Sequence, residues 1–244
     1  MVKTVHAQRG QIQNRSWFAI KAQAETNDAE VLIYDYIGWG GVTAADFAKE
    51  LKALKAQTIT VRLNTPGGDV FDGLAIYNSL KDHGATIKVK IDGLAASIGS
   101  IIAMAGSTIT MGESAFLMIH NPWALVIGNA KDMREMADTL DKIGGSLAGV
   151  YATRKGVSKE QAQAWMNEER WFTAAEATAA GLADVIEPPA SVENRQTFDL
   201  SGYANTPAAM QLTEHGGGSV DAASRARVAV MRKRLALVER GERS

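Results

Sequence analysis

Short apolar segments with strand character alternate along the chain with amphipathic helical segments, and this alternation constrains the fold more than any other feature. Residues 31–34, 59–63 and 87–91 are typical of buried strands, and a segment with helical spacing follows each of them. The pattern predicts an α/β domain in which crossover helices join parallel strands. Because ligands of such domains gather at the carboxyl ends of the strands, we expect a functional site at the glycine-containing turns 64–68 and 93–97.

Composition excludes several classes of protein for this chain of 244 residues. Its 26 basic and 27 acidic residues give a net charge of -1, so no global positive field attracts nucleic acid or an anionic membrane. The absence of cysteine excludes disulfide scaffolds, thiolate metal sites and a cysteine nucleophile. The start lacks the apolar stretch of a secretory signal, and no run approaches the roughly 20 apolar residues of a membrane helix. We therefore expect a cytoplasmic protein that binds neither nucleic acid nor membrane.

Ser97 lies in the segment Ala95-Ala-Ser-Ile-Gly99, where a strand turns into a helix among small residues. This is the context of a nucleophile elbow, although an alanine replaces the first glycine of the G-x-S-x-G pattern. A serine at a helix start can equally cap the helix through its hydroxyl group. The local residues leave both interpretations open.

A glycine pair, Gly67-Gly68, follows the strand 59–63 and can present backbone N–H groups to a developing negative charge. The N–H of Ile98, beside Ser97, can supply a second donor. Together they would form an oxyanion hole. Seen alone, however, the Pro-Gly-Gly sequence is also an ordinary turn.

His120 is the one credible general base, because it follows an apolar strand into a Pro-containing turn. The other histidines, His6, His83 and His215, lie in polar segments. A lone histidine at a strand end can also be purely structural, and the scattered positions show no metal-ligand spacing such as H-E-x-x-H. The sequence thus predicts no metal site.

Four motifs, in their order and spacing, resemble the ClpP family of serine peptidases, family S14. They are Asn64-Thr-Pro-Gly-Gly-Asp69, Asp92-Gly-Leu-Ala-Ala-Ser-Ile-Gly-Ser100, Met118-Ile-His-Asn-Pro122, and Trp171-Phe-Thr-Ala-Ala-Glu-Ala177 with Gly181-Leu-Ala-Asp184. The resemblance covers about residues 30 to 187. It implies the ClpP/crotonase fold, an α/β fold of repeated ββα units with a protruding handle helix.

The same resemblance implies a serine endopeptidase, ATP-independent or chamber-type, that needs no cofactor. It implies Ser97 as the nucleophile, His120 as the general base, and Gly68 and Ile98 as the oxyanion donors. We also expect substrate contacts from Gly67, Val70 and Trp123. The expected partners are protein substrates and further copies of the chain in a ring or stacked rings.

The chain departs from the housekeeping ClpP pattern at the third member of the triad. Where the family usually has an aspartate, two residues before the aromatic of the last motif, this chain reads Glu169-Arg-Trp171. Glu176 fits a capping box with Thr173, and Asp184 lies beyond the helix end at Gly181. The polar face of a long helix accounts for four further acids, Asp132, Glu135, Asp138 and Asp141. We therefore predict that Glu169 orients His120.

The Glu-x-Trp variant, the leader and the long C-terminal extension resemble the ClpP-like head maturation proteases of tailed phages and prophages. This predicts processing of capsid or scaffold proteins, in the cytoplasm or within a procapsid. The expected division of the chain is a leader at 1–28, the peptidase domain at 29–187, a flexible linker at 188–219 and a basic amphipathic helix at 220–244. That last helix is either a solvated tail or a contact for an acidic partner.

Residues 129–154 show a long helical pattern with an apolar stripe. A helix of this length extends for about 39 Å, more than a domain of this size easily covers, so we expect it to mediate self-association. The alternative is a stripe buried against the chain's own sheet. The stripe consists of Met133, Met136, Leu140, Ile143 and Leu147.

Two other functions remain open at this point. Crotonase-like acyl-CoA enzymes share the fold and its glycine-turn oxyanion hole but need no Ser–His pair. A catalytically idle capsid assembly or scaffold protein could keep the fold merely to build rings.

Overall fold

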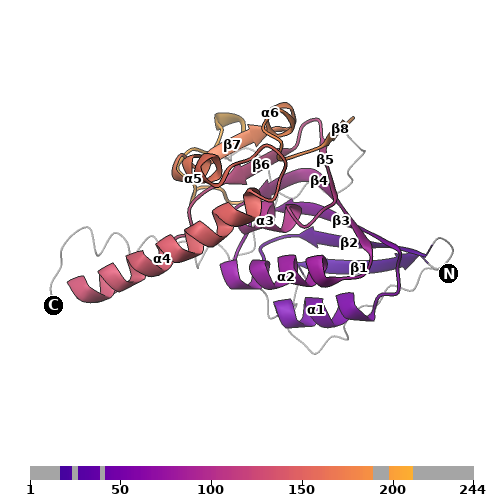
Figure 1. Cartoon of the computed structure of the whole chain (residues 1–244), viewed down its shortest axis with the longest axis horizontal. Coiled ribbons are helices and arrows are strands. Elements are labelled where there is room, and N and C mark those ends of the chain that lie inside the picture. The colour runs from indigo at the N-terminus through magenta and orange to yellow at the C-terminus, as the bar shows by residue number, and fades with distance from the viewer. Residues whose placement is uncertain (1–16, 24–26, 39–41, 189–197, 211–244) are drawn as a thin grey trace.

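The computed structural model describes residues 17–23, 27–38, 42–188 and 198–210, which build one eight-stranded sheet with helices packed on it (Figure 1). Strand order is β1-β2-β3-β4-β5-β8, with β6 paired to β4 and β7 paired to β6. β1 and β7 run antiparallel to their partners, and the other pairings are parallel. The strands are β1 (Phe18–Gln23), β2 (Asp28–Tyr34), β3 (Thr58–Thr65), β4 (Thr86–Ala96), β5 (Thr108–Gly112), β6 (Phe116–Ile119), β7 (Arg170–Thr173) and β8 (Val185–Glu187).

Six α-helices and one short 3₁₀ turn accompany this sheet in the described part of the chain. Crossover helices after β2, β3 and β4 agree with the right-handed βαβ connections expected of parallel strands. Reciprocal side-chain caps begin α6 at Thr173, as the sequence predicts, and also begin α1 at Thr43 and α4 at Asn129. The helices are α1 (Ala44–Ala53), α2 (Val70–Asp82), α3 (Ile98–Ala103), α4 (Ala130–Tyr151), α5 (Lys159–Asn167), α6 (Ala174–Ala179) and η1 (Ala208–Met210).

β4 is the strand that creates the site, because it pairs with two strands along its length. Its first part pairs with β5, whereas its last residues, Leu94 to Ala96, pair with Phe116 to Met118 of β6. The Ser97 N–H then donates to the Met118 carbonyl oxygen over 3.0 Å. The residues that follow β4 and β6 therefore emerge side by side.

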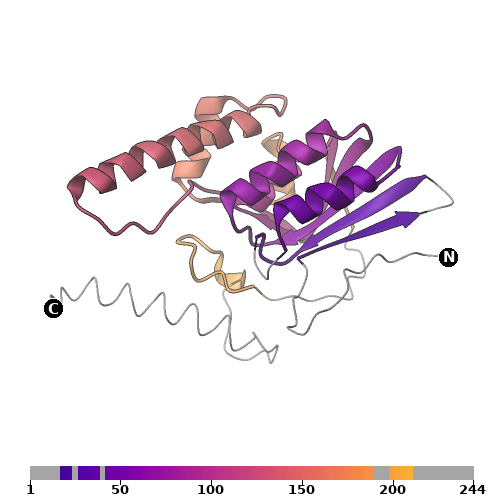
Figure 2. The same cartoon turned by 90° about the horizontal axis from the view of Figure 1, so that it is seen from below.

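Alternation along the end of β4 sends its side chains into two different cores. Ala95 belongs to the large core beneath helices α1 to α3, whereas Leu94 and Ala96 pack with Met118 in a second cluster. That second cluster also contains Phe198 and Leu200, both nearly fully buried. In Figure 2 their segment, coloured yellow, lies on the side of the sheet opposite α1 and α2.

The packed unit extends beyond both boundaries that we predicted for the peptidase domain. At the start, residues 18–23 form β1 within the predicted leader and pair with β2. At the end, residues 198–210 lie within the predicted linker, yet aromatic and aliphatic side chains anchor them on the sheet. Sequence reasoning missed this because the surrounding stretch is mostly polar. The basic helix predicted at 220–244 lies outside the described residues.

Helix α4 protrudes from the body of the molecule (Figure 1). Its C-terminal half is anchored through Leu147, Ala148 and Tyr151, whereas Met133 near its start is 53% exposed. The predicted α/β fold class with a protruding helix is therefore confirmed. None of the helices in the described part of the chain is long and apolar enough to cross a membrane.

Candidate active site

Ser97 occupies a strained turn between β4 and α3. Its backbone has φ 55° and ψ −127°, a conformation that residues with a side chain rarely adopt and that is typical of functional turns. The Ser97 hydroxyl makes no capping hydrogen bond to α3. Of the two interpretations of this serine, the geometry therefore disfavours the cap.

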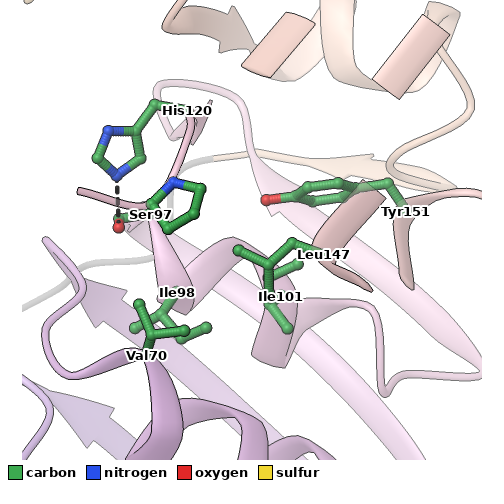
Figure 3. A pocket seen from close by; sticks show the side chains of 8 residues that line it. Val70, Ser97, Ile98, Ile101, His120, Leu147 and Tyr151 are labelled. Atoms are coloured by element: carbon green, nitrogen blue, oxygen red, sulfur yellow. Dashed lines mark hydrogen bonds between the residues drawn. The ribbon is translucent and has the colours of Figure 1, made fainter. Parts of the chain in front are cut away.

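The Ser97 side chain instead faces His120 at the end of β6. Ser97 Oγ and His120 Nε2 are 2.7 Å apart, as the dashed line in Figure 3 marks. With Nε2 unprotonated, the imidazole accepts the hydroxyl proton along this hydrogen bond. Sheet pairing alone brings the two residues together, although 23 positions separate them.

The glycine turn after β3 lies directly against Ser97. A Cβ placed on Gly67 would be 2.7 Å from the Ser97 Cβ, so the turn can approach only without a side chain. Gly67 has φ 100° and Gly68 has φ 152°, and the Thr65 hydroxyl accepts the Gly67 N–H over 3.1 Å. Thr65 thus orders the turn, a role that sequence reasoning missed.

Two backbone donors point to an oxyanion site. The Ile37 N–H donates to the Gly67 carbonyl oxygen, and the Ile37 carbonyl oxygen accepts the Asp69 N–H. The Gly68 N–H, between these two bonds, takes no part in this bridge. Ile98 opens α3, where the first N–H groups have no partner within the helix. Among the described residues neither the Gly68 nor the Ile98 N–H donates a hydrogen bond, so both can serve a ligand oxygen.

Glu169, the predicted third member of the triad, is near His120 but is engaged elsewhere. Its carboxylate accepts the N–H groups of Ala204 over 2.9 Å and of Asn205 over 2.6 Å. Trp171 Nε1 donates a longer bond of 3.4 Å. Within the described residues no hydrogen bond joins Glu169 to the His120 ring, although its negative charge still raises the pKa of that histidine.

No other acid in the described part of the chain takes that place beside His120. Glu176 accepts the N–H and hydroxyl of Thr173 in its capping box. Asp184 pairs with Arg154 and accepts the Ile109 N–H. Glu169 is thus the acid whose charge acts on the imidazole.

Burial is the larger influence on His120. It lowers the pKa of the imidazole below its ordinary value, and the opposing effect of Glu169 is smaller. The ring is therefore neutral at neutral pH, which a general base requires.

Tyr203 is the main feature of the site that sequence patterns do not predict. Its ring meets the His120 ring edge-on with the centroids 5.3 Å apart, and its hydroxyl donates to the Pro66 carbonyl oxygen. An aromatic pair, Phe198 and Tyr203, within a polar stretch was the available signal. By itself such a pair says nothing about where the segment docks.

A small apolar pocket lies beside the Ser–His pair, with side chains from α2, α3 and α4 pointing into it (Figure 3). Val70 lines it, whereas Gly67 lies against Ser97 at its edge. Trp123 is not among its lining residues and is 60% exposed. Besides Ser97 and His120, the lining consists of Val70, Ile98, Ile101, Pro122, Leu147 and Tyr151.

No group of three or more histidine or acidic side chains in the described part of the chain is arranged to hold a metal ion. The chemistry that this site can perform with its own groups is acyl transfer. It offers a hydroxyl nucleophile, a neutral base and two backbone donors.

Comparison with known proteins gives a consistent picture. The Clp protease family model matches residues 18–189. The chain is 33% identical over 131 residues to the ATP-dependent Clp protease proteolytic subunit 3 of Rhodococcus jostii, covering 52% of this chain and 64% of the relative. It is 35% identical over 141 residues to the proteolytic subunit 2 of Nocardia farcinica, covering 56% and 68% respectively. The chain thus spans about two thirds of the length of these relatives.

Proposed function

Because the chain belongs to the Clp protease family, we propose that it is a serine endopeptidase with Ser97 as nucleophile and His120 as general base. The observation that carries the proposal is the 2.7 Å hydrogen bond between Ser97 Oγ and His120 Nε2 at a strained strand-to-helix turn. A crotonase-like acyl-CoA enzyme has no need of this pair. An idle assembly protein has no need of the strain.

In the first half of the reaction, Ser97 Oγ attacks the peptide carbonyl carbon while His120 Nε2 takes the hydroxyl proton. The carbonyl oxygen becomes negatively charged and accepts hydrogen bonds from the Gly68 and Ile98 N–H groups. His120 then gives its proton to the leaving amine as the C–N bond breaks. The product is an ester between Ser97 and the acyl part of the substrate.

Water completes the reaction by attacking this ester while His120 again takes a proton. Collapse of the second tetrahedral intermediate returns the proton to Ser97 Oγ and releases the carboxylic acid. Glu169 stabilises the imidazolium that forms twice in the cycle, through its negative charge. No metal or cofactor takes part in these steps.

The side chains around Ser97 are mostly apolar, which supports a preference for an apolar side chain next to the scissile bond. They include Val70, Leu147 and Tyr151, which line the small pocket beside the Ser–His pair. Since burial of apolar surface is the favourable interaction here, a charged side chain would bind poorly. Trp123 is exposed and follows His120 closely in the sequence, and we propose it as a more distant substrate contact.

Self-association into rings is part of the proposal. The loop before α4 and the start of that helix expose large apolar side chains that single soluble domains normally cover. They are Trp123, Leu125, Ile127 and Met133, each more than half exposed. A ring would cover them and enclose the peptidase sites.

Phage head maturation, with capsid or scaffold protein as substrate, is the finer role that we propose. It rests on the Glu169-Arg-Trp171 variant and on the extension beyond residue 187. A search of the neighbouring genes for a capsid gene, followed by co-expression with the capsid protein found there, tests it. Discrete shortened products with the parent, absent with Ser97→Ala, support the role, and an intact capsid protein contradicts it.

Covalent labelling tests the peptidase proposal against its rivals. A fluorophosphonate should label the parent protein at Ser97, as identified by mass spectrometry of the modified peptide, and Ser97→Ala should remain unlabelled. Turnover of acyl-CoA thioesters without labelling would favour the crotonase-like alternative. Neither labelling nor turnover would favour an idle assembly protein.

A further inference from the structure

The segment 198–206, here called the strap, is held across the sheet beside the catalytic pair. Phe198 and Leu200 insert into the cluster formed by Leu94, Ala96 and Met118. Tyr36 adds an edge-on ring contact to Phe198 and donates its hydroxyl to the Asp199 carbonyl over 3.0 Å. These contacts fix one end of the strap.

At its centre the strap places Tyr203 directly on the reactive groups. The Tyr203 ring lies against His120, and its hydroxyl bonds to the carbonyl of Pro66, the residue before the Gly67-Gly68 turn. Burial raises the pKa of the Tyr203 hydroxyl, and the nearby Ser97 side chain partly offsets that rise. The phenol thus lies between the His120 ring and the residue that precedes the oxyanion turn, close to where a substrate carbonyl would have to lie.

The far end of the strap binds Glu169. Two consecutive backbone N–H groups, of Ala204 and Asn205, donate to its two carboxylate oxygens. The Asn205 side chain adds a bond to the Glu168 carbonyl over 2.8 Å. Both carboxylate oxygens of Glu169 therefore accept hydrogen bonds from the strap, and among the described residues no hydrogen bond joins Glu169 to His120.

From this arrangement we infer that the strap is an inhibitory segment that docks against the catalytic pair of its own chain and holds the peptidase latent. The inference rests on the proposed function of Ser97 and His120. The strap covers the catalytic pair with Tyr203 and engages Glu169, which makes no hydrogen bond to His120 in the described part of the chain. Displacement of the strap frees both.

The chemistry of the contact makes the strap a poor substrate. The group that it places beside the catalytic pair is a phenol and not a peptide carbonyl, so Ser97 has no electrophilic carbon to attack. A segment joined to the same chain also binds at a high effective concentration, which a separate peptide must exceed. Its exposed residues, Ser201, Gly202, Ala204 and Asn205, leave it accessible to a partner that lifts it away.

The rate of fluorophosphonate labelling at Ser97 in the full-length protein tests the inference. Tyr203→Ala should be labelled at least about tenfold faster than the parent. Without the Tyr203 ring, a smaller fraction of the molecules has the strap docked on Ser97 and His120. The parent should still label slowly, since the strap opens transiently. Tyr203→Phe, which keeps the ring on His120 but loses the hydroxyl bond to the Pro66 carbonyl, should fall between the two.

Gly202→Ala is the matched control, because a Cβ at this neighbouring position meets no atom within 4 Å. It should label at the parental rate. Amide hydrogen exchange of Ala204 and Asn205 gives a readout independent of catalysis. It should be slow in the parent and fast in Tyr203→Ala.

The outcomes separate the two proposals. Rapid labelling of the parent that Tyr203→Ala leaves unchanged would overturn the inhibitory strap while leaving Ser97 as the nucleophile. Absence of labelling in every variant, even where exchange shows the strap released, would overturn the proposed function and this inference with it. Thermal unfolding of each variant shows that the compared proteins are folded.

Discussion

The two sides of the candidate active site are held in different ways. Ser97 and His120 lie at the ends of paired strands. The hydrogen bonds of the sheet therefore hold Ser97 Oγ 2.7 Å from His120 Nε2. Glu169 follows α5, has φ 47°, and directs its carboxylate at the strap. Strand pairing makes one side part of the core, whereas the other side depends on a few reversible contacts. Substitutions on the Ser97–His120 side should therefore change the chemical step, whereas substitutions on the Glu169–strap side should change its regulation.

The largest effect should come from removing either member of the catalytic pair. Ser97→Ala and His120→Ala should each lower peptide hydrolysis by about 10³- to 10⁶-fold, because residues of a triad act as a unit. Hydrolysis is measured with a peptide that carries an apolar residue before the scissile bond. Both variants should keep the parental unfolding temperature and particle size. Retained cleavage by Ser97→Ala would show that the nucleophile lies elsewhere.

A substitution in the glycine turn should have the next largest effect. In Gly68→Ala the new Cβ would lie 2.1 Å from the Ile37 carbonyl oxygen, so the turn must shift and take its N–H away from the oxyanion position. Loss of one such donor lowers kcat by about 10²- to 10³-fold. The measurement is kcat for the same peptide.

Gly84→Ala is the control for this variant, since its Cβ meets no atom within 4 Å and the residue lies in an exposed turn. Its kcat should equal that of the parent. A folded Gly68→Ala protein with unchanged kcat would remove Gly68 from the oxyanion hole.

Sequence patterns anticipated the sheet-bound side of the site much better than the strap side. Ser97, His120 and Gly68 sit in local motifs whose spacing reflects strand ends and turns, and such motifs can be read without coordinates. The crossover helices were predictable for the same reason, because apolar spacing and caps are local signals. Even so, the pairing of β4 with both β5 and β6 has no local signature, although it is what joins the Ser–His pair.

The strap could not be predicted because its binding is decided by distant contacts. Polar residues surround Phe198, Leu200 and Tyr203, and composition therefore indicates a linker. Their partners, Met118 and His120, lie some 80 positions earlier in the chain. The same limitation applies to Glu169, whose position in the motif indicates a triad acid but gives no sign that backbone N–H groups compete for it.

The dependence of activity on pH should show how closely the two sides are coupled. Activity requires neutral His120, so kcat/KM rises as the pH passes upward through the pKa of its imidazole. Burial lowers that pKa, which places the acidic limb below the ordinary histidine value. Because Glu169 raises the pKa, Glu169→Gln should move the limb to still lower pH and reduce the plateau by about tenfold.

This comparison is best made in the Tyr203→Ala background, where the strap no longer competes for the carboxylate. Glu176→Gln serves as the control, since that acid caps α6 and should leave the limb in place. An acidic limb that Glu169→Gln does not move would show that Glu169 does not act on the histidine.

The smallest direct effect on chemistry should come from the exposed part of α4, which lies far from the motifs but is expected to hold copies together. Its C-terminal half is fixed by Leu147 and Tyr151, which also line the pocket, so a charge at Leu147 would damage the site itself.

Ile127 and Met133 are 86% and 53% exposed, and they allow the assembly to be tested separately. Ile127→Glu with Met133→Glu should yield smaller particles in sedimentation velocity and only a few-fold lower peptide hydrolysis, with the unfolding temperature of the subunit unchanged. Thr139→Glu, about 120° around the same helix from Met133 at 100° per residue, should sediment like the parent. If the Tyr203→Ala protein, with its strap released, sediments as a monomer at tens of micromolar while it hydrolyses peptide, the ring is unnecessary, and the catalytic geometry is maintained by the sheet alone.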